Sequence, residues 1–441
     1  MSLRKILGRT GLVLAVLVTA VLVMRAVLNY TTGKKLEKFL AAEKSKGLPV
    51  SYADLGPGCL GQENAKPLWK AAEALFEGRY REKINLSTAL ANLYEGRPID
   101  EKTRSIIKAA IDRNRRSIDF LLEASSLPCY RETDRSDPFK VEKLGTILQL
   151  IRLLGFEAYF RSESGDVRGA LDEWIKGFRF IRLTVQEPNL MDALVGISNA
   201  RSLLVHLDRI VDGRAADVED LKAVLHVLDV PAWRVAVAGA WRIERIMQIE
   251  TVREILRGHP PEYQSGWWME SLFWLARPLV RTHLMRQCSA IDNIETMWRG
   301  PFYLSRPRMN AFDDRHKRPP WYDRLPDDGI SNTSATGMKE ASLEALMETA
   351  RIGLAARIFQ AREKRFPAAI ADLVPDILPR EPLDPFTGKP LVFRIDKDRL
   401  LVYSLGSNEK DDGGRGKYSI EQLVTPKDDD WAWRDTIRLE K

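Results

Sequence analysis

The chain has few cysteines and few histidines, which limits the chemistry it can support. Its 441 residues include only Cys59, Cys129 and Cys288, and no C-x-x-C pair. This spacing argues against a zinc site and against a multi-disulfide framework. Buried thiols are the expected state, although one pair could oxidise outside the cytoplasm. The five histidines are scattered without an H-E-x-x-H pair, so metal-dependent hydrolysis has little support.

Sequence motifs for phosphate binding and nucleophilic catalysis are also missing. The chain has no G-x-x-x-x-G-K-[ST] loop and no G-x-S-x-G elbow. Residues 56–61 match G-x-G-x-x-G, but no strand leads into them and Pro57 stiffens them, so we interpret them as a loop. We therefore predict no catalytic or cofactor-binding residues. A hydrolase that acts on envelope material remains an alternative, because catalytic residues can lie far apart in sequence.

The body of the chain carries no excess of basic charge. The net charge is +7, and residues 1–46 hold nine Lys/Arg against two Asp/Glu, so the rest of the chain has equal numbers of basic and acidic residues. A nucleic-acid-binding domain is expected to carry its basic excess on the folded surface that meets phosphates. We therefore expect no nucleic-acid partner.

A long apolar run near the amino terminus predicts a membrane anchor. Residues 11–24 are free of charge, Arg25 follows, and the run ends at Leu28, which gives about 27 Å of helix. Residues 1–10 then form a basic cytoplasmic tail. A cleaved signal peptide is the alternative, but no small-x-small site follows Leu28. The membrane is thus one predicted partner, reached through residues 11–28.

Residues 29–300 are predicted to form a helical domain. Apolar residues recur there at helical spacing, with few prolines. The clearest unit is a helical hairpin over residues 147–182, which turns at Gly165-Asp166 and places Trp174 and Phe178 in the groove between its helices. Its turn, small residue and aromatic are similar in spacing to a tetratricopeptide repeat. Because stacked repeats need about three units, we expect a helical bundle or an irregular solenoid.

Two segments follow at the end of this helical region. Aromatic residues gather at Trp267, Trp268, Phe273, Trp274 and Trp298, beside two arginines. Core packing is their expected role, and a membrane interface or a partner surface is the alternative. Residues 301–338 mix Pro, Gly, Asp, Asn and Arg without periodicity, which predicts a linker.

Residues 339–441 are predicted to form a small α+β domain. An apolar stripe makes residues 339–365 a long amphipathic helix. Residues 391–395 and 400–405 alternate around a short polar turn, which predicts an antiparallel hairpin packed on that helix. The expected fold class is therefore mainly α, with a transmembrane helix, a helical domain and this α+β domain.

The carboxyl-terminal segment resembles the major pseudopilins of type II secretion. The order of the helix end at Phe366-Pro367, the segment 384–390, the hairpin and Asp411-Asp412-Gly413-Gly414 carries the resemblance. It implies a calcium ion held by oxygens of Asn408, Asp411 and Asp412, which residues 428–430 could complete. A solvated acidic turn without metal is the alternative. The apolar run lacks the glutamate of pseudopilins, so a pilus subunit is not expected.

Most of the chain is similar to a broad class of uncharacterised membrane-anchored bacterial proteins that join helices to such a domain. Residues 64–72 and 277–281 contribute to the likeness. Together with the basic residues before the apolar run, which favour a cytoplasmic amino terminus, this predicts one pass through the bacterial inner membrane with the body on the periplasmic side. The expected function is a non-enzymatic scaffold that binds protein partners, with no small-molecule substrate identified. An accessory role in a secretion or pilus-like system is an alternative.

Overall fold

The computed structural model describes most of the chain. The described residues are 3–55, 59, 61–131, 144–186, 189–228, 230–258, 267–316, 332–396, 399–415 and 430–436. Within them the helices are α1 (Leu3–Ser45), α2 (Lys66–Leu75), α3 (Leu86–Tyr94), α4 (Glu101–Arg113), α5 (Arg115–Ala124), α6 (Leu144–Glu163), α7 (Val167–Thr184), α8 (Leu190–Val211), α9 (Val218–Val227), α10 (Val230–Arg257), α11 (Trp267–Trp298), α12 (Phe302–His316) and α13 (Thr333–Glu363). The strands are β1 (Val392–Asp396), β2 (Arg399–Ser404) and β3 (Trp431–Thr436).

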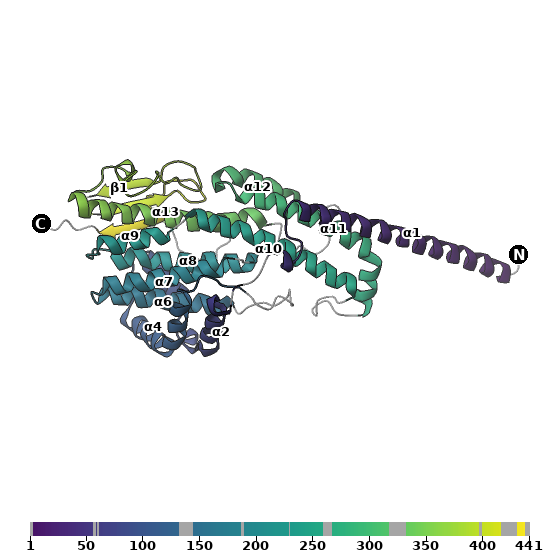
Figure 1. Ribbon diagram of the computed structural model, residues 1–441, viewed down its shortest axis with the longest axis horizontal. Helices are drawn as coiled ribbons and strands as arrows, with labels where there is room; N and C mark the ends of the chain where they lie inside the picture. The colour runs from purple at the N-terminus through teal and green to yellow at the C-terminus, as the bar shows by residue number, and fades with distance from the viewer. Residues whose placement is uncertain are drawn as a thin grey trace.

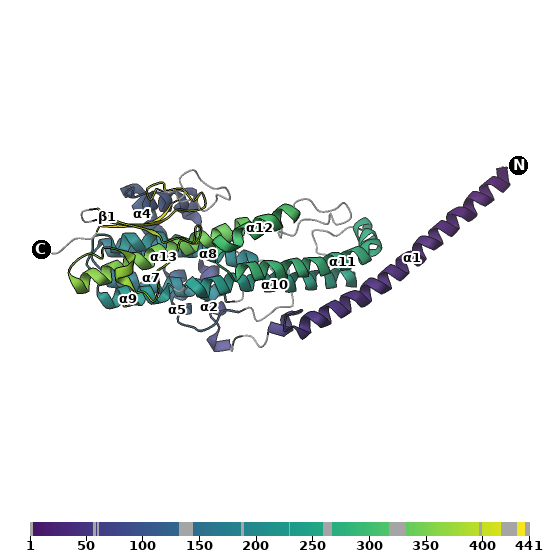
Figure 2. The same ribbon diagram turned by 90° about the horizontal axis from the view of Figure 1, so that it is seen from above.

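The molecule is an elongated helical body from which α1 projects. Figures 1 and 2 show α2 to α9 together with α13 and the sheet at one end, α10 and α11 extending toward the other end, and the first half of α1 standing free beyond them. This arrangement puts the amino terminus far from the sheet. The fold is mainly helical with a small antiparallel sheet, as the sequence predicts.

Helix α1 is one continuous helix from Leu3 to Ser45. Within residues 12–45 it contains a stretch of 18 residues that is long and apolar enough to cross a membrane, and none of that stretch is buried in the body. The predicted boundaries at residues 10 and 28 are therefore not breaks in the helix. Beyond the apolar stretch, Leu36 of α1 packs with Val280 and Leu284 of α11 in a small core of its own.

The predicted helical hairpin is present as α6 and α7. Asp166 caps α7, where its Oδ1 accepts the backbone N–H of Gly169 at 2.9 Å. Trp174 and Phe178 are fully buried and stacked with ring centroids 4.9 Å apart. Gly177 allows close packing, since a Cβ there would lie 2.5 Å from Leu154 Cδ2. The helical hairpin is thus confirmed, whereas its similarity to a tetratricopeptide repeat stays a prediction.

The predicted linker over residues 301–338 is wrong at both ends, because α12 begins at Phe302 and α13 begins at Thr333 instead of at the predicted residue 339. Residues 302–316 form α12, and residues 317–331 lie outside the described part of the chain. Pro301 directly precedes the helix, where a missing N–H costs little, and Pro307 lies inside it. The buried Asp313 of α12 accepts the backbone N–H of Thr333 at 3.0 Å and so caps α13. Residues 302–316 are therefore a packed helix.

The carboxyl-terminal sheet is antiparallel in the order β1-β2-β3. The predicted hairpin is present, with Asp396 opposite Arg399. Strand β3 was not predicted. Helix α13 lies between the sheet and helices α8, α9, α10 and α12, and Figure 1 shows the sheet beside α13 at the end of the body.

The sheet shares its core with the helices instead of forming a separate unit. One continuous cluster of buried residues extends from Ala65 of the segment before α2 to Trp433 of β3. Tyr94 of α3 joins the two regions, because its hydroxyl donates to the carbonyl of Asp430 and accepts the N–H of Ala432, both at 3.2 Å. The helices and the sheet therefore pack as one body.

Candidate functional site

The predicted calcium ligands lie in the loop after β2 and bind one another and their neighbours. The Asn408 side-chain amide donates to Asp412 Oδ2 at 2.9 Å. Asp411 accepts from the Tyr403 hydroxyl at 2.8 Å and forms an ion pair with Arg394 at 2.9 Å. The tyrosine and its neighbours lower the pKa of Asp411. These contacts stabilise the loop within the chain itself.

Asp430 closes the same loop from the sheet side. It is fully buried, and its Oδ2 accepts the backbone N–H groups of Asp412 at 3.0 Å and Gly414 at 2.7 Å. Burial raises the pKa of Asp430 to about 6. Asp428 and Asp429 lie outside the described residues, within which no group of three or more acidic, histidine or cysteine side chains is arranged to hold a metal. Calcium binding by this loop stays a prediction.

A stripe of buried acids follows one face of α13. Glu340, Glu344 and Glu348 recur every fourth residue and are each less than 9% exposed. Glu344 pairs with Arg234 of α10. Burial raises the pKa of Glu340 to about 8 and that of Glu348 to about 7. Perturbed carboxyls can indicate catalysis, but these side chains line neither of the two pockets described below, so we assign them to packing between helices.

The strongest candidate for ligand recognition is a pocket of about 470 Å³ on the helical body, which we call the basic pocket. It lies where the end of α7 meets the end of α9, the start of α10 and the residue after α5. Its lining combines cationic, polar and apolar side chains, namely Ser125, Arg179, Arg182, Leu183, Val185, Gln186, His226, Val227, Trp233, Val235 and Ala236.

The cationic groups of the basic pocket are not used by the fold. Arg179 and Arg182 lie one turn apart on α7, and within the described residues neither guanidinium has a carboxylate or a hydrogen-bond acceptor. His226 is exposed at the end of α9. The Trp233 side chain is 2% exposed, and its indole N–H likewise lacks an acceptor in the described part. The pocket therefore presents two guanidiniums and an exposed histidine to a ligand, and its lining includes no carboxylate.

Backbone and packing constraints fix these groups in place. Helix α9 is capped by Asp217, whose Oδ1 accepts the N–H of Glu219 at 3.1 Å. Trp233 packs against Phe178 with ring centroids 5.9 Å apart, which fixes α10 against α7. Apolar residues beside the arginines, with Val235 73% exposed, leave apolar surface open to a ligand. The pocket can thus bind a molecule that is both anionic and partly apolar.

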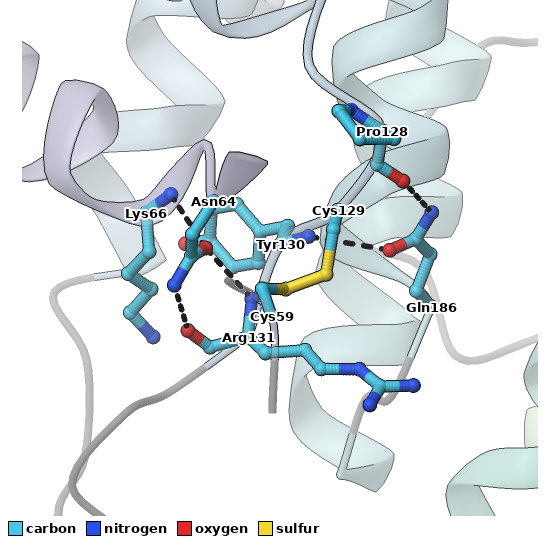
Figure 3. Close-up of a disulfide and its surroundings, with 8 residues drawn as sticks. All are labelled: Cys59, Asn64, Lys66, Pro128, Cys129, Tyr130, Arg131 and Gln186. Carbon is cyan, nitrogen blue, oxygen red and sulfur yellow. Dashed lines mark hydrogen bonds between the residues drawn. A yellow bond between two sulfur atoms is a disulfide. The ribbon is translucent and has the colours of Figure 1, made fainter. Parts of the chain in front are cut away.

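A disulfide between Cys59 and Cys129, whose Cα atoms are 6.1 Å apart, lies next to residues that hold one side chain of the basic pocket. Gln186 lines the pocket and joins this region, because it donates to the Pro128 carbonyl at 3.0 Å and accepts the Tyr130 N–H at 3.2 Å. Figure 3 shows Gln186 on the Cys129 side of the bond. The disulfide therefore restrains the segment on which the end of α7 rests.

The disulfide corrects the expectation of three buried thiols. Only Cys288 is a free and buried thiol. On the far side of the bond, Asn64 donates to the Arg131 carbonyl at 2.9 Å and accepts the Arg131 N–H at 3.1 Å, as Figure 3 shows. Segments 70 residues apart are thus joined by both covalent and hydrogen bonds. The sequence could not choose this pair, since cysteine spacing alone leaves the connectivity open.

A second pocket of about 520 Å³ lies between α1, α11 and α12 and is a weaker candidate. Its arginine and histidine on α12 are engaged already. Arg315 Nε donates to the Ala311 carbonyl at 3.1 Å, and His316 Nδ1 lies 2.8 Å from the Phe312 carbonyl. The Phe312 and His316 rings stack with centroids 3.9 Å apart. Less of its polar surface is therefore left for a ligand.

The aromatic-rich region divides between two environments. Trp298 is buried against Trp241, with centroids 5.5 Å apart, so the expected core packing is confirmed for it. Trp274 is 45% exposed and lies under the guanidinium of Arg25, which corrects that expectation at this position. The side chains of residues 267–273 lie outside the described part.

Comparison of the chain with protein-family models, with curated proteins and with solved structures finds no match. The interpretation of the site therefore rests on the chemistry of its own residues. The sequence did not reveal the basic pocket, since its arginines, histidine and tryptophan come from three helices and form no local motif.

Proposed function

We propose that this protein is a membrane-anchored, non-enzymatic scaffold of the bacterial envelope that binds an acidic, partly apolar segment of a partner protein. The observation that carries the proposal is the basic pocket. Arg179 and Arg182 are guanidiniums without partners in the described residues, and they lie beside apolar side chains. Carboxylates pair well with guanidiniums in two-pronged geometry, and apolar residues next to them add affinity.

The disulfide and α1 support the location of this activity. Disulfides persist in oxidising compartments and are rare in the cytoplasm. The Cys59–Cys129 bond belongs to the body, on the carboxyl-terminal side of the apolar stretch of α1. An anchor that crosses the inner membrane once, with the body on the periplasmic side, accounts for both features.

A role beside a secretion or pilus-like machine is a second proposal for the same chain. Helix α13 packed on an antiparallel sheet supports the resemblance to pseudopilins. However, most of α13 is buried by helices on the side away from the sheet. Docking through this region would therefore use the sheet and its loops, and the basic pocket remains the better-supported binding site.

A binding measurement tests the proposed function. The intact protein in lipid nanodiscs is titrated with fluorescent peptides rich in Asp, Glu and Leu, and with matched Asn/Gln/Leu peptides. We expect binding of the acidic peptides that weakens with salt, and at least tenfold weaker binding, about 1.4 kcal/mol, in the double variant Arg179→Glu/Arg182→Glu.

The matched control is the double variant Lys102→Glu/Arg113→Glu, which makes the same total charge change at two exposed side chains of α4 outside the pocket. It should leave the affinity within about twofold, since surface charges separated by more than about 10 Å are largely screened. Equal losses in the control and the pocket variant would show that only net charge matters. Absence of binding by every acidic peptide would reject the proposed ligand.

A further inference from the structure

Trp274, in the first turns of α11, lies beside α1 near the end of the apolar stretch of α1. Arg25 lies three residues before the end of that stretch, and its guanidinium lies 3.2 Å from the centroid of the Trp274 ring. Its Nη2 also donates to the Trp274 carbonyl at 2.8 Å. One charge inside the apolar run of α1 is therefore satisfied by α11.

Further contacts keep α11 beside α1 as both helices enter the body. Arg281 Nη1 donates to the carbonyl of Asn29 at 2.8 Å and to its side-chain oxygen at 2.6 Å. Deeper in the body, Arg245 of α10 lies between Glu43 of α1 and Asp292 of α11, at 3.1 Å and 2.8 Å. Contacts near the start and near the end of α11 therefore fix its position along the axis of α1.

The start of α11 turns away from the direction of the anchor. Pro278 lies inside α11, where the ring removes a backbone hydrogen bond and bends the helix. In Figures 1 and 2 the first turns of α11 run across the long axis of the molecule, next to α1. A membrane that α1 crosses would thus meet this segment roughly along its length.

The composition of the segment fits the interface between lipid headgroups and hydrocarbon. Residues 267–277 hold three tryptophans and one phenylalanine, while Glu270 and Arg277 are the charged residues and lie two turns apart. Of the described side chains, Trp274 is 45% exposed, and Leu279 just after the proline is 57% exposed. Tryptophan is enriched at membrane interfaces, and helices of this kind lie in the plane of the bilayer.

We propose that residues 267–279 of α11 lie in the interface of the same leaflet that α1 leaves, so that the body contacts the lipid bilayer at a second place. The occupant is lipid, because the surface is continuous with the apolar anchor through the Arg25–Trp274 contact. Contact with the bilayer at both α1 and residues 267–279 restricts rotation of the body about the anchor. This inference rests on α1 crossing a membrane and is independent of the basic pocket.

Depth-dependent quenching tests the inference on the intact protein. In a Cys288→Ala background with the disulfide retained, single cysteines replace Leu279, Val27 or Leu304, and each is labelled with an environment-sensitive fluorophore. The protein is reconstituted alone into phosphatidylcholine vesicles that contain lipid spin-labelled near the headgroup. Val27 reports the anchor, and Leu304 of α12 is an exposed leucine on the body, 62% exposed against 57% for Leu279.

We expect spin-labelled lipid to quench the label at position 279 at least about twofold more strongly than the label at 304, as for other interfacial residues. Soluble iodide should show the opposite order. Equal behaviour at 279 and 304, with strong lipid quenching at 27, would overturn the inference while leaving the anchor intact. Loss of lipid quenching at 27 as well would show that α1 does not insert, and the inference would fall with the anchor.

Discussion

At the residue scale, the packing of α6 against α8 requires a residue without a side chain, Gly155 of α6, opposite His206 of α8. His206 of α8 is fully buried, and burial lowers the pKa of its imidazole to about 4. Its Nδ1 lies 2.8 Å from the Ser202 carbonyl, and its ring meets Phe156 edge-on at 4.8 Å. The ring occupies the space above Gly155, where a Cβ would lie 2.5 Å from Nδ1. His206 is thus a structural, neutral residue and not a ligand.

We predict that Gly155→Ala lowers the stability of the protein by about 1–3 kcal/mol, because the added methyl group overpacks a rigid buried ring. The measurement is the thermal unfolding midpoint in detergent, followed by circular dichroism. The control is Gly145→Ala near the start of the same helix, where a Cβ meets nothing within 4 Å. This change should be neutral or slightly stabilising. Equal midpoints for the two variants would contradict the packing described here.

At the element scale, α13 tolerates a stripe of acids because it is enclosed by helices and the sheet. Burial disfavours the charged form of Glu340, and Glu344 beside it adds to the effect, so the pKa rises to about 8. The folded protein therefore holds this proton more tightly than the unfolded chain does. The contribution of Glu340 to the free energy of unfolding is therefore most favourable below the unfolded pKa near 4.5. It decreases as the pH rises toward the folded pKa of about 8.

We predict that Glu340→Gln stabilises the protein at pH 8 by at least about 1.4 kcal/mol, the equivalent of one pKa unit, and has little effect at pH 4.5. The measurement is the unfolding midpoint of both proteins across this pH range. Glu381→Gln, at an exposed position, serves as the control for the removal of one carboxyl group. A Glu340→Gln effect that is constant with pH would mean that this carboxyl does not titrate in the range.

The segments around residues 59 and 129 depend on their covalent connection. We predict that Cys59→Ser/Cys129→Ser lowers the free energy of unfolding by about 2–4 kcal/mol, because the bond closes a long loop in the unfolded chain. A reductant should lower the midpoint of the natural protein to that of the double variant and leave the variant unchanged. If the natural protein did not respond to reductant, the two cysteines would not be bonded.

Prediction from sequence succeeded where the signal was local. The apolar run of α1, the Gly165-Asp166 turn and the alternating residues of strands β1 and β2 each lie within a short stretch, and each of these features is present. Helix α12 was missed because Pro307 obscured its helical character, although its cap on α13 comes from Asp313. Strand β3 was missed because it is far from its partner β2 in the sequence. No local pattern therefore indicates that the two strands pair.

The candidate site was less predictable than the fold, since it depends on which distant residues meet. Arg179 resembles any exposed arginine on a helix until His226 and Trp233 are placed beside it. The disulfide likewise requires that residues 59 and 129 be brought together, and Gln186 connects it to the pocket only in three dimensions. Composition gave no indication of this pocket, because the body is neutral as a whole.

At the scale of the whole molecule, the anchor and the basic pocket belong to different parts of one rod-shaped protein. Helix α1 projects from one end, α10 and α11 extend beside its base, and the pocket lies where α7, α9 and α10 meet in the body. The buried Arg245 of α10 joins the base of α1 to α11, because it pairs with the buried Glu43 and with the partly exposed Asp292. A partner bound in the pocket would therefore be held at a fixed distance from the membrane.

The most direct test of the scaffold account is photocrosslinking in intact cells that produce the protein, with a photoreactive residue replacing Val235 at the edge of the pocket. Leu304 on α12, which is also exposed, is the control position. We predict an adduct at 235 whose crosslinked peptide is acidic, no such adduct at 304, and loss of the adduct in the Arg179→Glu/Arg182→Glu background. An adduct that survives this charge reversal, or the absence of any adduct at 235, would contradict the account.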